Sequence, residues 1–336
     1  MAGPVGRRVR RTGHRRAAMS MKTYSDAGKT ALAECMRADP TIWAVGEDLG
    51  RGGVFGQYMG LEEEFGPERI VSTPISEAAI MGSAVGGALT GTRPVVELRF
   101  ADFALCAVDE MVNQAAKARY MFGGQAKVPL VIRQPSGMWR SSAAQHSQSL
   151  EAWYAHIPGL VVLMPSTPAD NYGLLKAAIE CDDPVVYMEH KDLWSLEDEV
   201  PGGHTLEIGK AHVVQEGSDV TIVTWSKTCH VAAEAAGALA ANGTSVELID
   251  LRSLWPWDRE CVLASAAKTG RLLVAHEAVR DGGFGAEVAA TAAEEIAGLK
   301  LARLGAPRIP IPYAPPLEDT VRVTAETIVD AVERLT

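Results

Sequence analysis

The sequence predicts a two-domain α/β protein in which a parallel β-sheet, covered by helices on both faces, is followed by a smaller α/β domain. Short strands rich in Val and Ile alternate with helical segments along most of the 336 residues, and this alternation is typical of parallel sheets. Pro, Gly and acidic residues interrupt it near the middle of the chain. We therefore expect a first domain at 22–192, an interdomain linker at 193–209 and a second domain at 210–336.

Hydrophobic spacing and turn residues place the individual elements. In the first domain we expect helices at 24–38, 61–65, 78–89, 103–120, 150–155 and 168–180, and strands at 42–45, 69–71, 95–98, 129–133, 160–164 and 184–188. In the second domain we expect strands at 220–224, 246–250 and 271–276, helices at 230–241, 259–267 and 286–296, an extended Pro-rich segment at 307–316 and a closing helix at 325–335.

Composition excludes several classes of protein. The chain is 47% hydrophobic and 22% charged, which is ordinary for a globular protein, and no apolar run is long enough to cross a membrane. Its net charge is -10, of which residues 1–22 contribute +7 and the remainder -17. An acidic body argues against nucleic-acid binding as the main task. Five scattered cysteines without a CxxC fit a reducing compartment.

A basic head at 1–21 is expected to be disordered and to take no part in the chemistry. It lacks the apolar core of a secretory signal. Three explanations stay open, namely a transit peptide, an Arg-rich arm, or upstream sequence read from too early a start codon. We expect a cytoplasmic bacterial protein, or one of the mitochondrial matrix if the head is a transit peptide.

The stretch at 72–91 stands out because a nearly all-apolar helix begins with one acid, Glu77. Thr73 or Ser76 can cap this helix. Its composition predicts burial, and its glycines allow another backbone to approach closely. A carboxylate buried beside such a helix is costly without a partner. The plain alternative is an exposed acid that favours the helix dipole.

Ligands of open parallel sheets bind beyond the carboxyl ends of the strands. Four groups follow strands there: Glu47, Glu77, Phe103 and the loop that carries His146. A lone histidine is more often structural or merely exposed, and no metal-ligand, phosphate-loop or serine-nucleophile motif is present. From the residues alone, we predict an acid and an imidazole near one crevice.

Several motifs taken together are more specific. In order they are Gly46-Glu-Asp-Leu-Gly50, Thr73-Pro-Ile-Ser-Glu77, Ala101-Asp-Phe103, Gln145-His-Ser-Gln148, Pro158-Gly-Leu160, Asp183-Pro-Val185, Ile249-Asp-Leu-Arg252 and Gly282-Gly-Phe-Gly285. From about residue 22 to 335 the chain resembles the beta subunit of the thiamine-diphosphate-dependent dehydrogenase component of 2-oxoacid dehydrogenase complexes. The resemblance implies a transketolase-like pyrimidine-binding domain, a transketolase C-terminal domain and an α2β2 assembly with active sites at α–β interfaces.

The resemblance also implies a thiamine diphosphate site shared with an alpha subunit. The diphosphate and its Mg²⁺ are usually held by a GDG motif and a later Asn, and no GDG occurs here. Glu77 would hydrogen-bond the aminopyrimidine, and proton sharing there drives the imino tautomer that deprotonates the thiazolium carbon. Burial would raise the pKa of this acid and the helix N-terminus would lower it. Phe103 would stack on the pyrimidine, and Ile75 and Glu47 would line its pocket.

Further positions are carried over in the same way. Arg99 lies near the cofactor, where relatives often have Gln or Met, and Arg140 is either a partner for a substrate carboxylate or a surface residue. His146 would stabilise intermediates and assist acyl transfer to lipoyl-lysine. A structural K⁺ would be held by backbone oxygens and one acid at Leu130, Ala178, Ile179, Cys181 and Asp183.

The implied function is that of an enzyme subunit. With an alpha subunit it would decarboxylate a 2-oxoacid such as pyruvate or a branched-chain acid, or cleave acetoin, and pass the acyl group to the lipoyl domain of an acyltransferase core. One alternative is half of a split transketolase, which would favour basic groups for sugar phosphates that we do not find. Another is a noncatalytic scaffold, against which the retention of Glu77, Phe103 and His146 counts.

Overall fold

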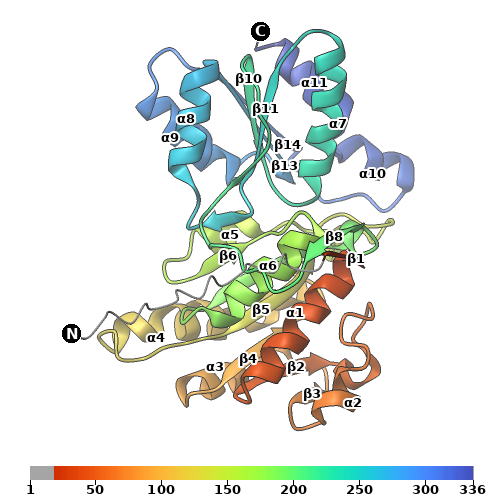
Figure 1. The fold of residues 1–336 in the computed structure, drawn as a ribbon, viewed down its shortest axis with the longest axis vertical. Coiled ribbons are helices and arrows are strands. Elements are labelled where there is room, and N and C mark those ends of the chain that lie inside the picture. Colours follow the sequence, from red (N-terminus) through yellow and green to blue (C-terminus); the bar gives the residue numbers. More distant parts are fainter. Residues whose placement is uncertain (1–18, 336) are drawn as a thin grey trace, which may run out of the picture.

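Two β-sheets organise the chain in the computed structural model, which describes residues 19–335 (Figure 1). The larger sheet has seven strands in the order β12-β6-β7-β5-β4-β2-β3, and the smaller has five in the order β14-β13-β10-β11-β9. Neighbouring strands are parallel except at the edges, where β12 and β9 are antiparallel to β6 and β11. The two-domain α/β architecture is therefore confirmed.

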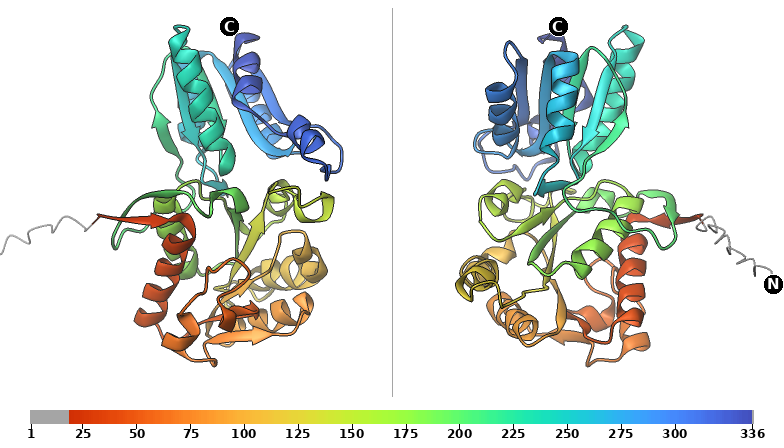
Figure 2. Two further views of the ribbon diagram at one scale, coloured as in Figure 1. Left: turned by 90° about the vertical axis from the view of Figure 1, so that its right-hand side faces the viewer. Right: turned by 60° about the vertical axis from the view of Figure 1, so that its left-hand side comes forward.

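The first domain holds the larger sheet between two helical layers. Every residue of its central strands β5 and β7 is buried, as expected for strands covered on both faces. Helices α1 and α6 lie on one face, and α3 and α4 on the other (Figures 1 and 2). Its elements are α1 Tyr24–Ala38, β2 Ile42–Glu47, α2 Leu61–Phe65, β3 Ile70–Thr73, α3 Glu77–Leu89, β4 Arg93–Glu97, α4 Ala116–Met121, β5 Val131–Ser136, α5 Glu151–Ala155, β6 Val161–Leu163, α6 Pro168–Glu180 and β7 Val185–His190.

The second domain repeats this plan on a smaller scale. Helices α8 and α9 lie on one side of its sheet, and α7 and α11 on the other (Figure 1). Its elements are β9 His212–Gln215, β10 Val220–Thr224, α7 Lys227–Ala241, β11 Val246–Asp250, α8 Arg259–Thr269, β13 Arg271–Val279, α9 Gly285–Glu295, β14 Lys300–Ala306, α10 Pro315–Val321 and α11 Ala325–Glu333. The predicted extended segment ends in a helix, because Pro315 and Pro316 occupy the first turn of α10, where proline is tolerated.

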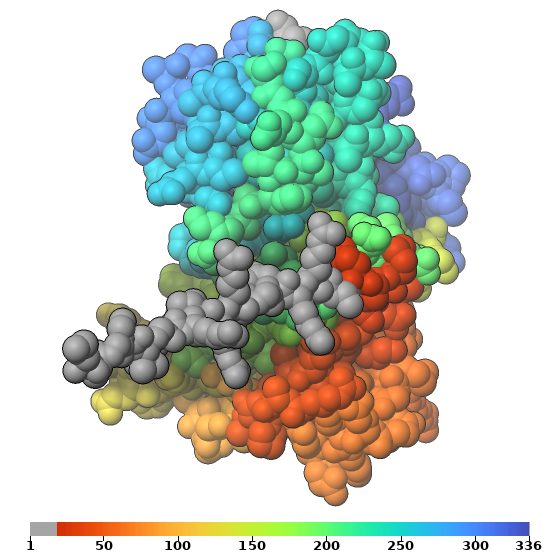
Figure 3. Space-filling view, in the orientation of Figure 1, coloured from red at the N-terminus to blue at the C-terminus, as the bar shows by residue number. Residues whose placement is uncertain are grey.

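Polar contacts and one strand join the two domains, which form separate lobes in the space-filling view (Figure 3). Strand β12, Ser253–Trp255, leaves the second domain and pairs with β6 of the first. The Arg252 guanidinium lies 2.6 Å from the Asp170 carboxylate of α6. The indole N–H of Trp225 donates to Glu151 of α5 at 3.2 Å. One apolar core cluster includes residues of both domains, so the domains pack directly against each other.

Two boundary predictions need correction. Residues 19–21, assigned to the disordered head, begin strand β1, Met19–Thr23, which pairs antiparallel with β8, Glu197–Pro201, inside the predicted linker. Each strand finds its partner far away in sequence, so neither has a local signal. Residues 1–18 of the predicted head lie outside the described residues.

The segment 103–120, predicted as one long helix, is helical but not a regular α-helix. It consists of a 3₁₀ turn at Phe103–Ala107, a π-helical stretch at Glu110–Ala115 and the short α4. Its apolar residues have helical spacing, but π turns also occur inside helices, frequently at functional sites, and hydrophobic periodicity does not reveal them.

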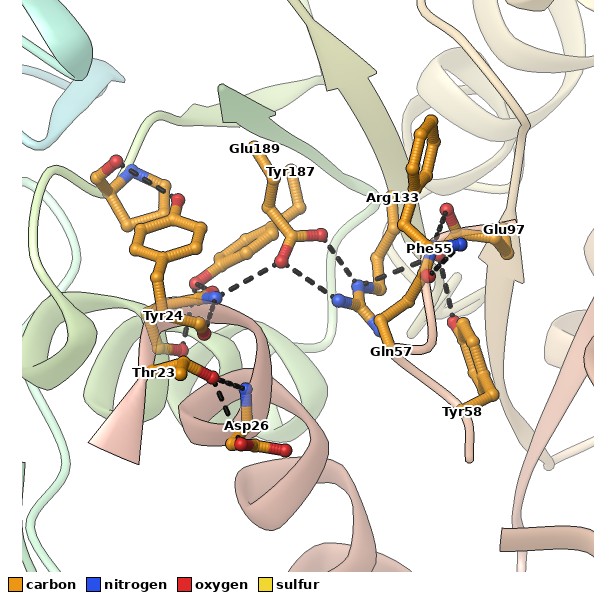
Figure 4. Close-up of polar contacts among 12 residues, drawn as sticks. Thr23, Tyr24, Asp26, Phe55, Gln57, Tyr58, Glu97, Arg133, Tyr187 and Glu189 are labelled. Atoms are coloured by element: carbon orange, nitrogen blue, oxygen red, sulfur yellow. Dashed lines mark hydrogen bonds and ion pairs between the residues drawn. The ribbon is translucent and has the colours of Figure 1, made fainter. Parts of the chain in front are cut away.

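A buried charge network fixes the centre of the first domain (Figure 4). Arg133, at 1% exposure, makes two 2.8 Å hydrogen bonds to the Glu189 carboxylate, and its Nε lies 3.7 Å from the carboxylate of Glu97. Tyr58 and Gln57 also donate to Glu97, at 3.0 and 3.2 Å. Burial raises the pKa of Glu97 to about 7, although Arg133 opposes this shift.

We expect Arg133→Met to lower the free energy of unfolding by about 3–5 kcal/mol, because it leaves the buried Glu189 carboxylate without its cation. Denaturant unfolding followed by circular dichroism measures the change. The matched control is Arg259→Met, which removes an exposed ion pair with Glu295 and should cost less than about 1 kcal/mol. Equal losses in the two variants would contradict a structural role for the network.

Glu97 also predicts a pH dependence of stability. The folded chain keeps this proton up to about pH 7, whereas the unfolded carboxyl releases it near its ordinary pKa of 4.5. Because the folded state then binds more protons, this group makes stability fall as pH rises from about 4.5 to 7.

Glu97→Gln should therefore reduce the loss of stability between pH 5 and pH 7. Some loss should remain, since burial also raises the pKa values of Glu151 and Asp250 to about 7. Urea midpoints at the two pH values measure the slope, and an unchanged slope in the variant would show that Glu97 does not hold the proton.

Candidate functional site

The four groups predicted to follow strands do gather at one edge of the larger sheet. Glu47 is the last residue of β2, and Glu77, the first residue of α3, follows β3. Phe103 follows β4, and His146 ends a 3₁₀ turn, Ala144–His146, in the loop after β5. Since β2, β3, β4 and β5 are parallel, their carboxyl ends meet at this edge.

One half of the site is charged. Arg99 lies 3.4 Å from the Glu47 carboxylate and 3.2 Å from that of Asp48. Burial raises the pKa of Glu47, the positive charge of Arg99 lowers it, and the negative charge of Glu77 raises it again. The carboxylates of Glu47 and Glu77 are therefore close enough to repel each other, and the guanidinium of Arg99 lies beside Glu47.

Glu77 itself is left open to a ligand. No hydrogen bond or ion pair joins its carboxylate to any other residue between 19 and 335, and its side chain is half-buried. Ser76 is the helix N-cap but makes no side-chain bond to the helix. Ile75, predicted to line the pocket, is 73% exposed. This side of the site is thus uncovered in the single chain.

The other half of the site is aromatic. The rings of Phe100, Phe103 and His146 contact one another edge to face, with centroids 5.1–5.5 Å apart. Phe55, from the Gly-rich loop after β2, packs on Phe100 at 5.8 Å and on Trp194 at 3.8 Å. The imidazole of His146 is therefore held beside the Phe103 ring by packing.

Lys191 is a site residue to which sequence reasoning gave no role. It is 2% exposed, its ammonium lies 4.9 Å from the Phe100 ring centre, and it donates to the backbone carbonyl of His146. Burial lowers its pKa to about 8. Phe100 and Phe55 were missed too, and the only signal for Phe100 is its position three residues before Phe103.

The predicted potassium ligands lie at the opposite edge of the larger sheet, just before β5 and β7 and at the carboxyl end of α6. Leu130, Ala178 and Ile179 are buried. The carbonyl oxygens of Ile179 and Cys181 accept hydrogen bonds from Arg93 at 3.0 and 3.1 Å. The Asp183 carboxylate pairs with Arg119 at 2.5 Å, so three of the five groups already have cationic neighbours.

Residues 19–335 contain neither a metal-binding cluster nor a membrane-spanning helix. No cluster of three or more His, Cys, Asp or Glu side chains there could hold a metal ion. No helix in the same range has the length and apolar character needed to cross a membrane.

Arg140 does not join the site. Its side chain is exposed, and its guanidinium lies 5.2 Å from the ring centre of the adjacent Trp139. The structure thus brings together Glu47, Glu77, Arg99, Phe103 and His146, and leaves Arg140 on the surface.

Comparison with known proteins gives the family. Residues 20–195 match the transketolase pyrimidine-binding domain, and residues 209–328 match the transketolase C-terminal domain. A solved structure described as a split-gene transketolase, an inactive beta4 tetramer, is similar with a TM-score of 0.79 and 26% identity, covering 93% of this chain and 97% of that one.

Curated relatives are more similar in sequence. The 2-oxoisovalerate dehydrogenase subunit beta of Bacillus subtilis is 42% identical over 94% of this chain and 99% of its own length. The acetoin:2,6-dichlorophenolindophenol oxidoreductase subunit beta of Cupriavidus necator is 42% identical over 90% and 94%. A mitochondrial pyruvate dehydrogenase E1 component subunit beta-2 of Oryza sativa is 41% identical over 99% and 93%. This chain therefore belongs to the family of dehydrogenase beta subunits that combine a transketolase pyrimidine-binding domain with a transketolase C-terminal domain.

Proposed function

We propose that the chain is the beta subunit of a thiamine-diphosphate-dependent dehydrogenase that acts on a 2-oxoacid or acetoin together with an alpha subunit. The observation that carries this proposal is that Glu77, whose carboxylate has no hydrogen-bond or ion-pair partner among residues 19–335, lies at the same sheet edge as the contacting rings of Phe103 and His146. Split transketolase is less favoured, because identity to the structure of that name is 26% against 42% to the dehydrogenase subunits.

The residues fit the pyrimidine half of thiamine diphosphate. An aminopyrimidine offers a ring nitrogen to an acid and a flat face to an aromatic ring, and Glu77 and Phe103 supply these two partners. When bound, the cofactor supplies the carbon nucleophile and the electron sink for decarboxylation. Glu77 holds and releases the proton at the pyrimidine nitrogen, while Glu47 and Arg99 form the charged wall beside it.

A partner chain must complete the site. The sequence has no GDG motif for the diphosphate and Mg²⁺. Helix α3, expected to be buried, has exposed small residues at Ala79, Gly82 and Gly86. A Cβ at Gly86 would meet no atom of residues 19–335 within 4 Å outside its own helix backbone, so no contact among these residues explains the missing side chain. We infer that an alpha subunit covers this face in an α2β2 assembly.

His146 is the group placed to act on the acyl product. Its imidazole makes no hydrogen bond to residues 19–335, which leaves both ring nitrogens for substrate and for a lipoyl group presented by an acyltransferase core. General acid–base catalysis by such a histidine contributes about 10²–10⁴-fold. The K⁺ site stays a prediction, in which Ile179 and Cys181 would use the second lone pair of carbonyls already bound by Arg93.

We expect Glu77→Gln to abolish turnover of the reconstituted assembly while leaving assembly intact, because glutamine cannot exchange a proton with the pyrimidine. The measurement is 2-oxoacid-dependent reduction of an acceptor dye, with size-exclusion chromatography to follow assembly. Glu294→Gln, on the exposed face of α9, is the control and should behave as wild type. Near-normal turnover of Glu77→Gln would remove Glu77 from the mechanism.

Replacement of His146 should slow acyl transfer to a lipoyl domain more than it slows reduction of a small dye. We expect His146→Asn to slow acyl transfer to a lipoyl domain by about 100-fold or more, while reduction of a small dye, which needs no transfer to a dithiolane, falls much less. Both rates are measured on the same reconstituted enzyme. Equal losses with the two acceptors would assign His146 to an earlier step instead.

A further inference from the structure

The loop that carries His146 has an unfavourable backbone. Between residues 137 and 149, three residues other than glycine have positive φ angles: Arg140 at 46°, Ser141 at 56° and Ala143 at 62°. Such conformations are uncommon for side chains of this kind, and they persist only where the surroundings over-determine them. Something outside residues 140–143 must therefore hold the loop in this shape.

Two carboxylates of the second domain contact the loop backbone. Glu277, on β13, accepts the amide of Met138 at 2.7 Å and the hydroxyl of Ser149 at 3.3 Å. Glu318, on α10, accepts the amide of Ser141 at 2.8 Å, within the strained part. In the left view of Figure 2, the yellow-green segment that contains the loop lies below the dark-blue α10.

Both carboxylates are themselves fixed. The Nε2 of His190 lies 3.0 Å from both oxygens of Glu277, and its Nδ1 accepts the amide of Asp192, so the proton is on the nitrogen that faces Glu277. Burial opposes ionisation of Glu277, but His190 and the Met138 amide outweigh it and hold its pKa below the ordinary value. Glu318 is 2% exposed and pairs with Arg322.

The other end of the loop is anchored inside the first domain. Gln148 donates to the carboxylate of Asp102 at 2.8 Å, and Lys191 donates to the His146 carbonyl. The chain between these anchors and Ser141 borders a cavity of about 370 Å³, lined among others by Gln145, Ser147 and Glu277. The cavity leaves room for the loop to shift if one anchor is lost.

We propose that Glu277 and Glu318 are positioning residues through which the C-terminal domain holds the His146 loop and sets the place of the imidazole beside Phe103. Neither carboxylate makes a hydrogen bond or ion pair with Glu77, Phe103 or the His146 imidazole, so both act through the loop. The catalytic consequence rests on the proposed function of His146, whereas the anchoring itself does not.

The test is hydrogen–deuterium exchange of peptides covering 137–149 in the full chain, together with kinetics of the reconstituted enzyme. We expect Glu318→Ala to raise exchange in this loop about tenfold and to lower kcat for acyl transfer about 10- to 100-fold, with little change in KM, because a misplaced catalytic group costs rate. Glu318→Gln keeps one acceptor oxygen for Ser141 and should restore most of both. Asp319→Asn, which removes only an exposed partner of Arg322, is the control.

The outcomes separate the two proposals. Unchanged exchange in the loop of Glu318→Ala would overturn the positioning role, whatever the activity. Faster exchange with unchanged acyl transfer would support the anchor and overturn the role proposed for His146. If Glu318→Ala does not fold, Glu277→Gln gives the same test at Met138, where the loss of charge should raise exchange while the melting temperature is preserved.

Discussion

The buried guanidinium of Arg133 is the constraint on which the first domain depends. It lies between two buried acids, pairing with the Glu189 carboxylate while Glu97 holds its proton up to about pH 7. In a low-dielectric interior, removing or displacing this group leaves a buried charge uncompensated and so lowers the stability of the fold. Through Glu97 it holds the loop that carries Phe55, and through Glu189 and Asn171 it reaches the backbone of Tyr24 at the start of α1. The network thus joins the core of the sheet to the loop that covers the aromatic half of the site.

The site built on this frame is incomplete in a specific way. Arg99 is shared between Glu47 and Asp48, and no Lys or Arg among residues 19–335 forms an ion pair with Glu77. An uncompensated carboxylate is tolerable here because it is only half-buried, and its burial by a partner chain would need a compensating proton or donor. A nitrogen heterocycle can donate a hydrogen bond to the carboxylate or share a proton with it. The exposed side of the site, where Glu77 lacks a partner, therefore suits a cofactor that is bound between this chain and a partner chain.

Sequence reasoning was most successful where a residue's position follows from the local chain. Glu47 and Glu77 lie at strand ends, and the parallel pattern alone predicts that such ends meet. The roles assigned to these residues came from the ordered motifs, which carry more information than any spacing of charges. Lys191, Glu277 and Glu318 were out of reach, because their function consists of contacts with a loop at least 45 residues away in the chain. The β1–β8 pair was missed for the same reason, since its two strands lie far apart in the chain.

The contacts between the domains give the second domain a part in the site, although Glu47, Glu77, Phe103 and His146 all belong to the first. Regular secondary structure can hold Glu77 and Phe103, because each lies at the first turn of a helical segment. His146 lies instead in a loop whose backbone is strained, and a strained loop cannot specify its own conformation. The carboxylates of β13 and α10 supply the missing acceptors from a body that is itself fixed to the first domain by Arg252 and β12. Under this proposal the position of the His146 imidazole depends on how the C-terminal domain packs on the first domain. A change in the position of that domain would therefore also move the histidine.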